Sequence, residues 1–169
     1  MQRRSVEAIV RALNDAGVRY LIAGGLAVVA HGFVRLTMDI DLVLDLEEAN
    51  LRRALAEFAS LGYRPRAPVP LEQFADGAMR ARWNAERGLK VFSLRSPEHA
   101  ATEIDLFVEP PFDFARAHDR CAYFEVAPGL TAPFVGLDDL VAMKRGAGRQ
   151  QDLLDIEKLE GLRTRGPEQ

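Results

Sequence analysis

The sequence predicts an α/β (α+β) protein in which one mixed sheet is flanked by helices. Segments with apolar residues at helical spacing alternate along the chain with short segments of strand character, and glycine or proline separates most of them. A length of 169 residues with 48% hydrophobic content suffices for one buried core. We expect a core over residues 1–135 and a helical segment over 136–169 packed on it, as a single domain.

Composition and charge exclude several classes of protein. The net charge of −3 gives no global basic field to attract nucleic acid. Cys121 is the only cysteine, so an internal disulfide is impossible, and no cluster of cysteine and histidine indicates zinc. The longest apolar run, residues 21–30, is far shorter than the roughly 18 residues that suggest a membrane span. We therefore expect a cytoplasmic protein with no membrane partner.

The first half of the chain shows clear alternation between helix and strand. A helix is expected where Val6, Ile9, Val10 and Leu13 recur, with Gly17 as its end. The segments that follow are a strand at 20–23, a short buried helix at 26–31, a strand at 39–44 and a helix at 51–58 that ends by Gly62. A proline-rich loop is expected at 65–70.

The second half is less regular until its end. Residues 71–87 are ambiguous between helix and irregular structure, whereas 89–94 and 102–108 have the character of neighbouring strands. Two weaker strands are expected within 122–135, separated by Pro128 and Gly129. Helical spacing returns from Leu137 to about residue 162, with a weak point at Gly146 and Gly148.

An acidic pair on a predicted strand is the first sign of chemistry. Residues i and i+2 of a strand lie on one face about 6.6 Å apart, so Asp39 and Asp41 face the same way while Ile40 and Leu42 face the core. Two such carboxylates repel each other unless a cation neutralises them. Oxygen ligands without cysteine or histidine favour a hard cation such as magnesium.

A second acidic strand and a glycine pair extend this pattern. Glu103 and Asp105 share a polar strand face, so three carboxylates from two strands could hold two metal ions for an in-line displacement at phosphorus. Gly24 and Gly25, between a strand and a helix, could let backbone N–H groups approach a phosphate. Each feature alone is also typical of a solvated sheet edge or an ordinary turn; their order and spacing together favour a site.

This combination resembles the nucleotidyltransferases of the DNA polymerase β superfamily, which carry a Gly-Gly or Gly-Ser turn, an Asp-x-Asp pair and a third carboxylate on a nearby strand. In this sequence the resemblance rests on Gly24-Gly25, the segment from Arg35 to Asp41, and Asp105. Lys144, Arg149, Asp152 and Asp155 are spaced like the lysine–arginine–aspartate motif of the AbiEii-type toxins of bacterial phage-defence pairs. The chain departs from these relatives at Leu26, where many have serine or threonine, and at Gln151, where the subgroup commonly has lysine.

The resemblance implies a metal-dependent enzyme that transfers a nucleoside monophosphate from a nucleoside triphosphate to an acceptor hydroxyl. The resemblance implies Asp39, Asp41, Asp105 and Lys144 as catalytic residues. The three aspartates would bind Mg²⁺ or Mn²⁺, Asp105 would also help to deprotonate the acceptor hydroxyl, and Lys144 would counter the charge of the phosphates. The residues implied for nucleotide binding are Gly24, Gly25, Arg35, Arg149 and Asp152. The tRNA 3′ end is the implied acceptor, with a cognate antitoxin as a partner. The rivals are a lincosamide or aminoglycoside nucleotidyltransferase and a noncatalytic domain that binds a nucleotide or a partner.

Several side chains have a structural and a functional interpretation. Lys144 follows Leu140 and Val141 on an apolar face and is expected to be partly exposed, either at the core edge or reaching a phosphate. Of Asp152 and Asp155, we favour Asp152 as the one that faces the site. His31 is expected to be structural, and Trp83 to fill the core. The basic stretch 77–95 could contact an RNA backbone or form a solvated face.

Overall fold

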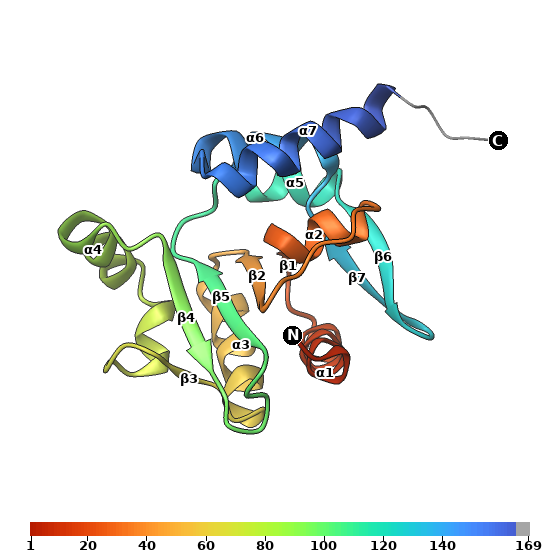
Figure 1. Ribbon diagram of the computed structural model, residues 1–169. Helices are drawn as coiled ribbons and strands as arrows, with labels where there is room; N and C mark the ends of the chain where they lie inside the picture. Colours follow the sequence, from red (N-terminus) through yellow and green to blue (C-terminus); the bar gives the residue numbers. More distant parts are fainter. Residues whose placement is uncertain (165–169) are drawn as a thin grey trace.

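A computed structural model describes the backbone of residues 1–164 and the side chains of residues 1–161 (Figure 1). Residues 165–169, the end of the predicted C-terminal segment, lie outside the described residues. The helices are α1 (Arg3–Asp15), α2 (Gly24–Ala30), α3 (Glu48–Ser60), η1 (Leu71–Ala75, a 3₁₀ helix), α4 (Gly77–Arg87), α5 (Phe114–Asp119), α6 (Leu137–Ala147) and α7 (Gln150–Thr164). The strands are β1 (Tyr20–Ile22), β2 (Asp39–Leu44), β3 (Arg64–Pro65), β4 (Val91–Arg95), β5 (Glu103–Phe107), β6 (Ala122–Ala127) and β7 (Leu130–Phe134).

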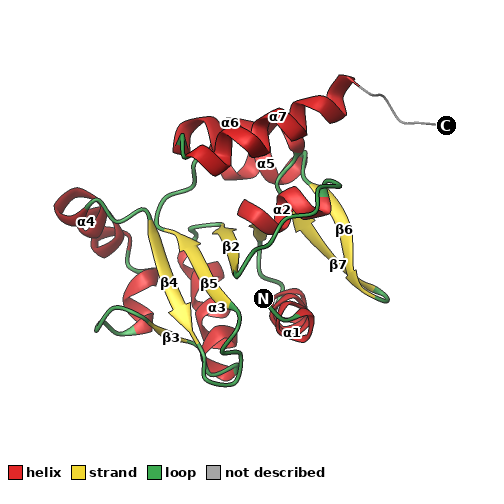
Figure 2. Ribbon diagram, in the orientation of Figure 1, coloured by secondary structure: helices red, strands yellow, loops and turns green. Residues whose placement is uncertain are grey.

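All of these strands belong to one sheet in the order β3-β4-β5-β2-β1-β7-β6, which Figure 2 shows in yellow. The pairs β2–β5 and β1–β7 are parallel, and the other neighbouring pairs are antiparallel. The predicted α/β class with a mixed sheet is therefore confirmed. The acidic strands β2 and β5 are direct neighbours at its centre.

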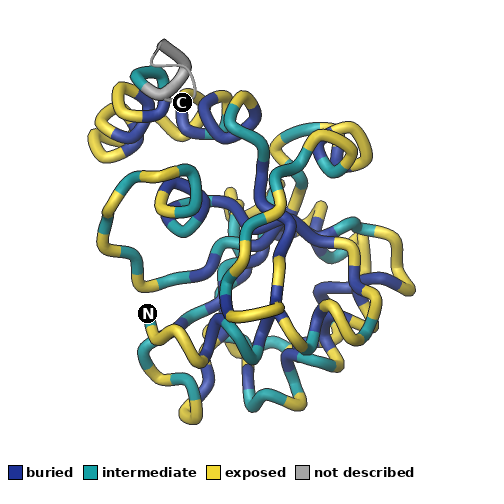
Figure 3. The backbone as a smooth tube through the Cα atoms, turned by 90° about the vertical axis from the view of Figure 1, so that its right-hand side faces the viewer, coloured by how far each residue is buried: buried dark blue, intermediate teal, exposed yellow. Residues whose placement is uncertain are grey.

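Helices cover both faces of the sheet. In Figure 1, α1 and α3 lie together on one side, while α2, α6 and α7 lie on the other. Apolar residues of β2 and β5, such as Ile40 and Ile104, are fully buried, whereas the acidic residues between them are partly accessible. The burial map in Figure 3 shows buried residues along the central strands and exposed residues mainly on outer helices and loops. The alternation in β2 and β5 thus separates a core face from a polar face.

Three segments differ from the sequence-based expectation. Residues 71–87 divide into η1 and α4, because the Asp76 side chain accepts hydrogen bonds from the N–H groups of Ala78 and Met79 and caps a new helix. The short edge strand β3 overlaps the expected proline-rich loop at Pro65, and Asp113 caps an unexpected helix, α5. At the predicted weak point, Gly148 takes a left-handed conformation and separates α6 from α7.

The remaining elements follow the predicted order, and β6 and β7 form the expected hairpin. Buried residues of α6 and α7, including Leu140, Val141, Ile156 and Leu159, belong to the same apolar cluster as the sheet. The boundary at residues 135 and 136 stays a prediction. Within the described part of the chain, no helix is long and apolar enough to cross a lipid bilayer.

Candidate active site

A cavity of about 820 Å³ lies on the polar face of the sheet, beside α6 and the start of α7. Its lining includes every residue that the sequence nominates for catalysis, nucleotide binding or metal binding. These residues are Gly24, Gly25, Arg35, Asp39, Asp41, Asp105, Lys144, Arg149 and Asp152. The cavity has an acidic wall on the central strands and a basic wall formed by Lys144, Arg149 and Arg35. Such a pairing suits a cation together with an anionic ligand.

The acidic wall is built by the register of two parallel strands. Asp41 of β2 lies opposite Asp105 of β5, and Asp39 lies opposite Glu103. Adjacent strands are about 4.8 Å apart, so these carboxylates are close neighbours. Glu103 does not line the cavity and pairs with Arg66 at 3.0 Å. The cavity therefore receives Asp39, Asp41 and Asp105, as the sequence predicts.

The electrostatics of this wall are unfavourable in the absence of a cation. Burial and the nearby charges of Asp105 and Asp39 raise the pKa of Asp41 to about 6, although Lys144 and the Gly25 N–H partly oppose this shift. Burial and the charges of Asp105 and Glu103 also raise the pKa of Asp39. These carboxylates would gain free energy from a neutralising partner.

A serine that the sequence alone does not reveal contacts the third carboxylate. Ser93 of β4 lies opposite Asp105 in the antiparallel β4–β5 pair, and its hydroxyl donates a hydrogen bond of 2.5 Å to Asp105 Oδ1. This bond holds one carboxylate oxygen in a defined orientation. The alternation of β4 places Ser93 on the polar face, but only the strand pairing reveals its partner.

Gly24 and Gly25 are required by close packing against the acidic wall. Gly24 has a positive φ of 60°, and a Cβ atom there would lie 1.8 Å from Asp41 Oδ2. A Cβ atom on Gly25 would lie 2.8 Å from the Thr37 hydroxyl and 3.3 Å from the Arg35 guanidinium carbon. The Gly25 N–H also donates to the Asp41 carboxylate. The glycine pair thus allows α2 to begin directly against Asp41.

Lys144 corrects an expectation, because the side chain is buried rather than partly exposed. Lys144 is 6% exposed, and its Nζ lies 2.8 Å from Asp155 Oδ2 and 3.2 Å from Asp152 Oδ1. The Asp152 carboxylate also accepts a hydrogen bond of 3.2 Å from the Arg149 N–H. Lys144 thus has carboxylate partners from α7 that the sequence did not identify. Its removal would leave Asp155 with Arg35, and Asp152 with Arg149, as the remaining cationic partner.

Asp155, which the sequence places in the same motif but does not assign to the site, is the second partner of Lys144. This carboxylate is fully buried, pairs with both Lys144 and Arg35, and accepts a hydrogen bond of 3.1 Å from Gln151. Burial would raise its pKa, but the bonds from Lys144 and Gln151 and the two positive charges hold the pKa below the ordinary value. The helical spacing of Asp152 and Asp155 could have indicated that both contact Lys144.

Of the other nominated residues, Lys90 of the basic stretch 77–95 also lines this cavity, whereas His31, Trp83 and Arg80 do not. His31 packs edge-on against Phe124, and its Nε2 lies 2.9 Å from the Val135 carbonyl oxygen, which fits a structural role. Trp83 is buried and stacks on Phe92. Arg80 is also buried and donates to the Phe74 carbonyl oxygen, so the basic stretch 77–95 does not form one continuous exposed surface.

The acidic wall has the right chemistry for a divalent cation but is not a preformed centre. Among the described residues, no three histidine, cysteine, aspartate or glutamate side chains are grouped closely enough to hold a metal ion as they stand. The three carboxylates therefore converge less tightly than the sequence suggests. Their all-oxygen donor set and mutual repulsion nevertheless fit Mg²⁺ or Mn²⁺.

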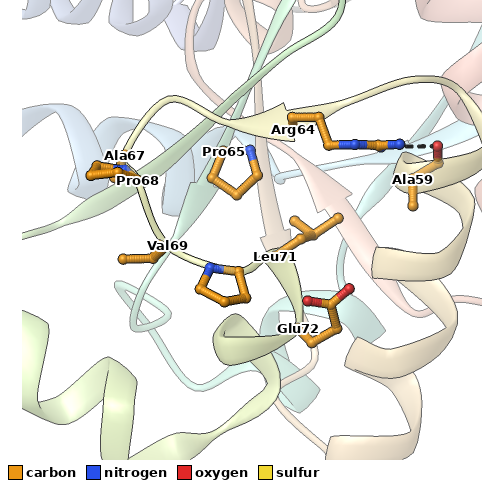
Figure 4. A pocket seen from close by; sticks show the side chains of 9 residues that line it. Ala59, Arg64, Pro65, Ala67, Pro68, Val69, Leu71 and Glu72 are labelled. Carbon is orange, nitrogen blue, oxygen red and sulfur yellow. Dashed lines mark hydrogen bonds between the residues drawn. The ribbon is translucent and has the colours of Figure 1, made fainter.

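A second cavity, of about 580 Å³, lies beside β3 and the proline-rich loop. Figure 4 shows its lining, with Pro65, Pro68 and Leu71 around it and Arg64 hydrogen-bonded to the Ala59 carbonyl oxygen. Arg64 and Glu72 are its only charged lining residues. This cavity lacks the opposed acidic and basic walls of the first one, so it offers no comparable site for chemistry.

Comparison with known proteins supports the architecture. No protein-family model and no curated protein sequence matches this chain. Among solved structures, the lincosamide antibiotic adenylyltransferase LnuA with bound lincomycin matches with a TM-score of 0.62 and 14% identity, over 95% of this chain and 97% of that one. ANT(2″)-Ia in complex with adenylyl-2″-tobramycin matches with a TM-score of 0.57 and 18% identity, over 96% and 95%. The chain therefore has the nucleotidyltransferase fold that these two antibiotic-modifying proteins share.

Proposed function

We propose that the protein is a metal-dependent nucleotidyltransferase that moves a nucleoside monophosphate from a nucleoside triphosphate to an acceptor hydroxyl. The oxygen of the acceptor attacks the α-phosphorus, the bond from that phosphorus to the bridging oxygen breaks, and pyrophosphate leaves. The observation that supports this most directly is the single cavity with three carboxylates on one wall and Lys144 and Arg149 on the other. Mg²⁺ or Mn²⁺ bound by these carboxylates would stabilise the attacking and leaving oxygens.

Each residue of the cavity has a role in this proposal. Asp39 and Asp41 bind the cation, and Asp105 binds it and accepts the proton of the acceptor hydroxyl. Ser93 orients Asp105 through its hydrogen bond to Oδ1. Lys144, Arg35 and Arg149 counter the charge of the phosphates, with Asp152 holding Lys144 and the Arg149 backbone in place. Gly24 and Gly25 keep side chains out of the space beside Asp41.

Two classes of acceptor follow from different observations. The lysine–arginine–aspartate motif resembles that of AbiEii-type toxins, and this resemblance supports the tRNA 3′ hydroxyl as acceptor and a cognate antitoxin as a partner in the cytoplasm. The two structural neighbours are instead described with lincomycin and with adenylylated tobramycin. They support a hydroxyl of a small antibiotic as the second candidate acceptor.

A labelling experiment distinguishes these acceptors. The purified protein is incubated with Mg²⁺ and each α-³²P-labelled nucleoside triphosphate, together with total bacterial RNA, a lincosamide or an aminoglycoside. We expect label on one acceptor class, and none with the Asp39→Ala variant. Label that persists in Asp39→Ala indicates a contaminating enzyme.

The noncatalytic rival makes a different prediction for the same materials. Isothermal titration with each triphosphate and Mg²⁺ measures binding without requiring transfer. Binding of a triphosphate without transfer of label to any acceptor, and without release of labelled monophosphate by hydrolysis, would favour a nucleotide-binding domain. Absence of both binding and transfer with every triphosphate would refute the proposed function.

A further inference from the structure

The basic wall of the cavity depends on a carboxylate that does not line the cavity. Asp155, on the second turn of α7, is absent from the lining, whereas Lys144 and Arg35, which it contacts, are both present. Lys144 belongs to α6, and Arg35 belongs to the segment between α2 and β2. One fully buried carboxylate thus joins three parts of the chain behind the site.

The arrangement of donors fixes Asp155 firmly. Its Oδ2 accepts from Lys144 and Arg35, and its Oδ1 accepts from the Gln151 side-chain amide at 3.1 Å. Both carboxylate oxygens are therefore engaged, and the buried charge has two cationic partners. Such a carboxylate cannot reorient without leaving buried charges unpaired.

Lys144 and Arg35 each have more N–H donors than their carboxylate partners use, and both side chains line the cavity. Lys144 has three N–H donors, and its carboxylate partners are Asp152 and Asp155. Arg35 has five N–H donors, and its guanidinium carbon would lie 3.3 Å from a Cβ atom on Gly25, beside which Asp41 lines the cavity. The segment that carries Arg35 alternates in exposure: Val34 and Leu36 are 96% and 88% exposed, while Arg35 and Thr37 turn inward to the cavity. Without its contact with Asp155, the Arg35 side chain would be expected to be exposed to solvent like Val34 and Leu36.

We propose that Asp155 is a positioning residue for nucleotide binding, which holds Lys144 and Arg35 so that their remaining donors face the phosphates. This inference rests on the proposed function and goes beyond it, because it assigns the orientation of the basic wall to α7. Without the carboxylate, Arg35 loses its contact with α7, and Lys144 keeps only Asp152. A misplacement of about 1 Å in such a group can cost up to about 10²-fold.

The main test compares triphosphate binding by the wild type and Asp155→Asn, which preserves shape but removes the charge. Titration of each triphosphate with Mg²⁺ into the full chain should show binding weakened by about tenfold or more in the variant. In the transfer assay, the KM for the triphosphate should rise while the KM for the acceptor stays unchanged. The matched control is Asp139→Asn, because Asp139 is also buried and paired with an arginine, Arg120, but does not line the cavity. That variant should lose stability without losing affinity.

A double-mutant cycle with Lys144→Met separates positioning from a general loss of structure. If Asp155 acts through Lys144, then Asp155→Asn should weaken binding much less in the Lys144→Met background than in the wild type. Equal effects in both backgrounds would overturn the proposal.

Unchanged affinity of Asp155→Asn for the triphosphate would also overturn the proposal while leaving the proposed function intact. Tighter binding would overturn it as well, because the carboxylate would then compete with phosphate. Failure of the wild type to bind any triphosphate would instead count against the proposed function itself.

Discussion

At the scale of single residues, Asp41 carries a predictable dependence of stability on pH. Its pKa is raised to about 6, so the folded state holds a proton that the unfolded state releases near pH 4. Stability should therefore fall as pH rises from about 4 to 6, by at most about 3 kcal/mol from this group. Asp41→Asn should remove that part of the pH profile and raise the melting temperature at pH 7. Identical profiles for the variant and the wild type in metal-free urea unfolding would refute the electrostatic account of the acidic wall.

Gly24 allows a test of close packing at the same point. Gly24→Ala should destabilise the fold and displace the Asp41 carboxylate, since the added Cβ would lie 1.8 Å from its oxygen. Gly17→Ala is a matched control, because Gly17 has a similar positive φ of 62° and no atoms within 4 Å of its Cβ position. Both changes incur about 1–2 kcal/mol of backbone strain. Chemical denaturation should show a larger loss for Gly24→Ala, and equal losses would mean that contact with Asp41 contributes nothing.

At the scale of elements, the pairing of α6 with α7 determines what Lys144 does. Lys144→Ala should lower turnover by about 10²-fold or more through the lost phosphate contact. It should also destabilise the fold, by at most about 3–5 kcal/mol, because Asp152 and Asp155 would lose their shared buried cation and keep only Arg149 and Arg35 as partners. Urea unfolding and a steady-state assay measure the two effects separately.

The control for that experiment is Lys158→Ala, which removes an exposed lysine from α7 and should alter neither quantity. Lys144→Arg should recover only part of the turnover, since a planar guanidinium does not replace a compact ammonium. Wild-type turnover in a folded Lys144→Ala protein would make this lysine purely structural.

The pairing of β2 with β5 predicts a response to metal. Mg²⁺ or Mn²⁺ should raise the melting temperature by mass action, because the cation relieves the repulsion between Asp41 and Asp105. Asp105→Asn should reduce this shift. Glu103→Gln, on the same strand but outside the cavity, should retain it. A shift that survives in Asp105→Asn would place the metal elsewhere on the protein.

At the scale of the whole molecule, charge limits how RNA could bind. The net charge is −3, and many surface arginines are already paired with acidic neighbours, as in Arg52–Glu48 and Arg82–Glu86. If tRNA is the acceptor, we expect few contacts with its phosphates. Its affinity, measured by fluorescence anisotropy, should fall by only about tenfold between about 50 and about 200 mM salt. A much steeper dependence would reveal a basic surface that this charge distribution does not suggest.

Local sequence patterns predict much of the architecture and the residues of the acidic wall. The alternation in Asp39–Leu44 and in Glu103–Phe107 reports which side chains share a strand face, because a strand repeats every two residues. A glycine pair between a strand and a helix likewise marks a close approach before its partner is known. These are short-range regularities, so local spacing is enough to identify them.

Tertiary structure alone decided which distant groups meet. The Ser93 hydroxyl finds Asp105 through strand pairing, and Arg35 meets Asp155 across 120 positions of sequence. Helical spacing placed Lys144 on an apolar face but could not show that α7 folds back to bury it against two carboxylates. Local sequence determined which side chains share a face, whereas the packing of α7 on α6 determined which charges neutralise one another, because ion pairs depend on distance in space rather than along the chain.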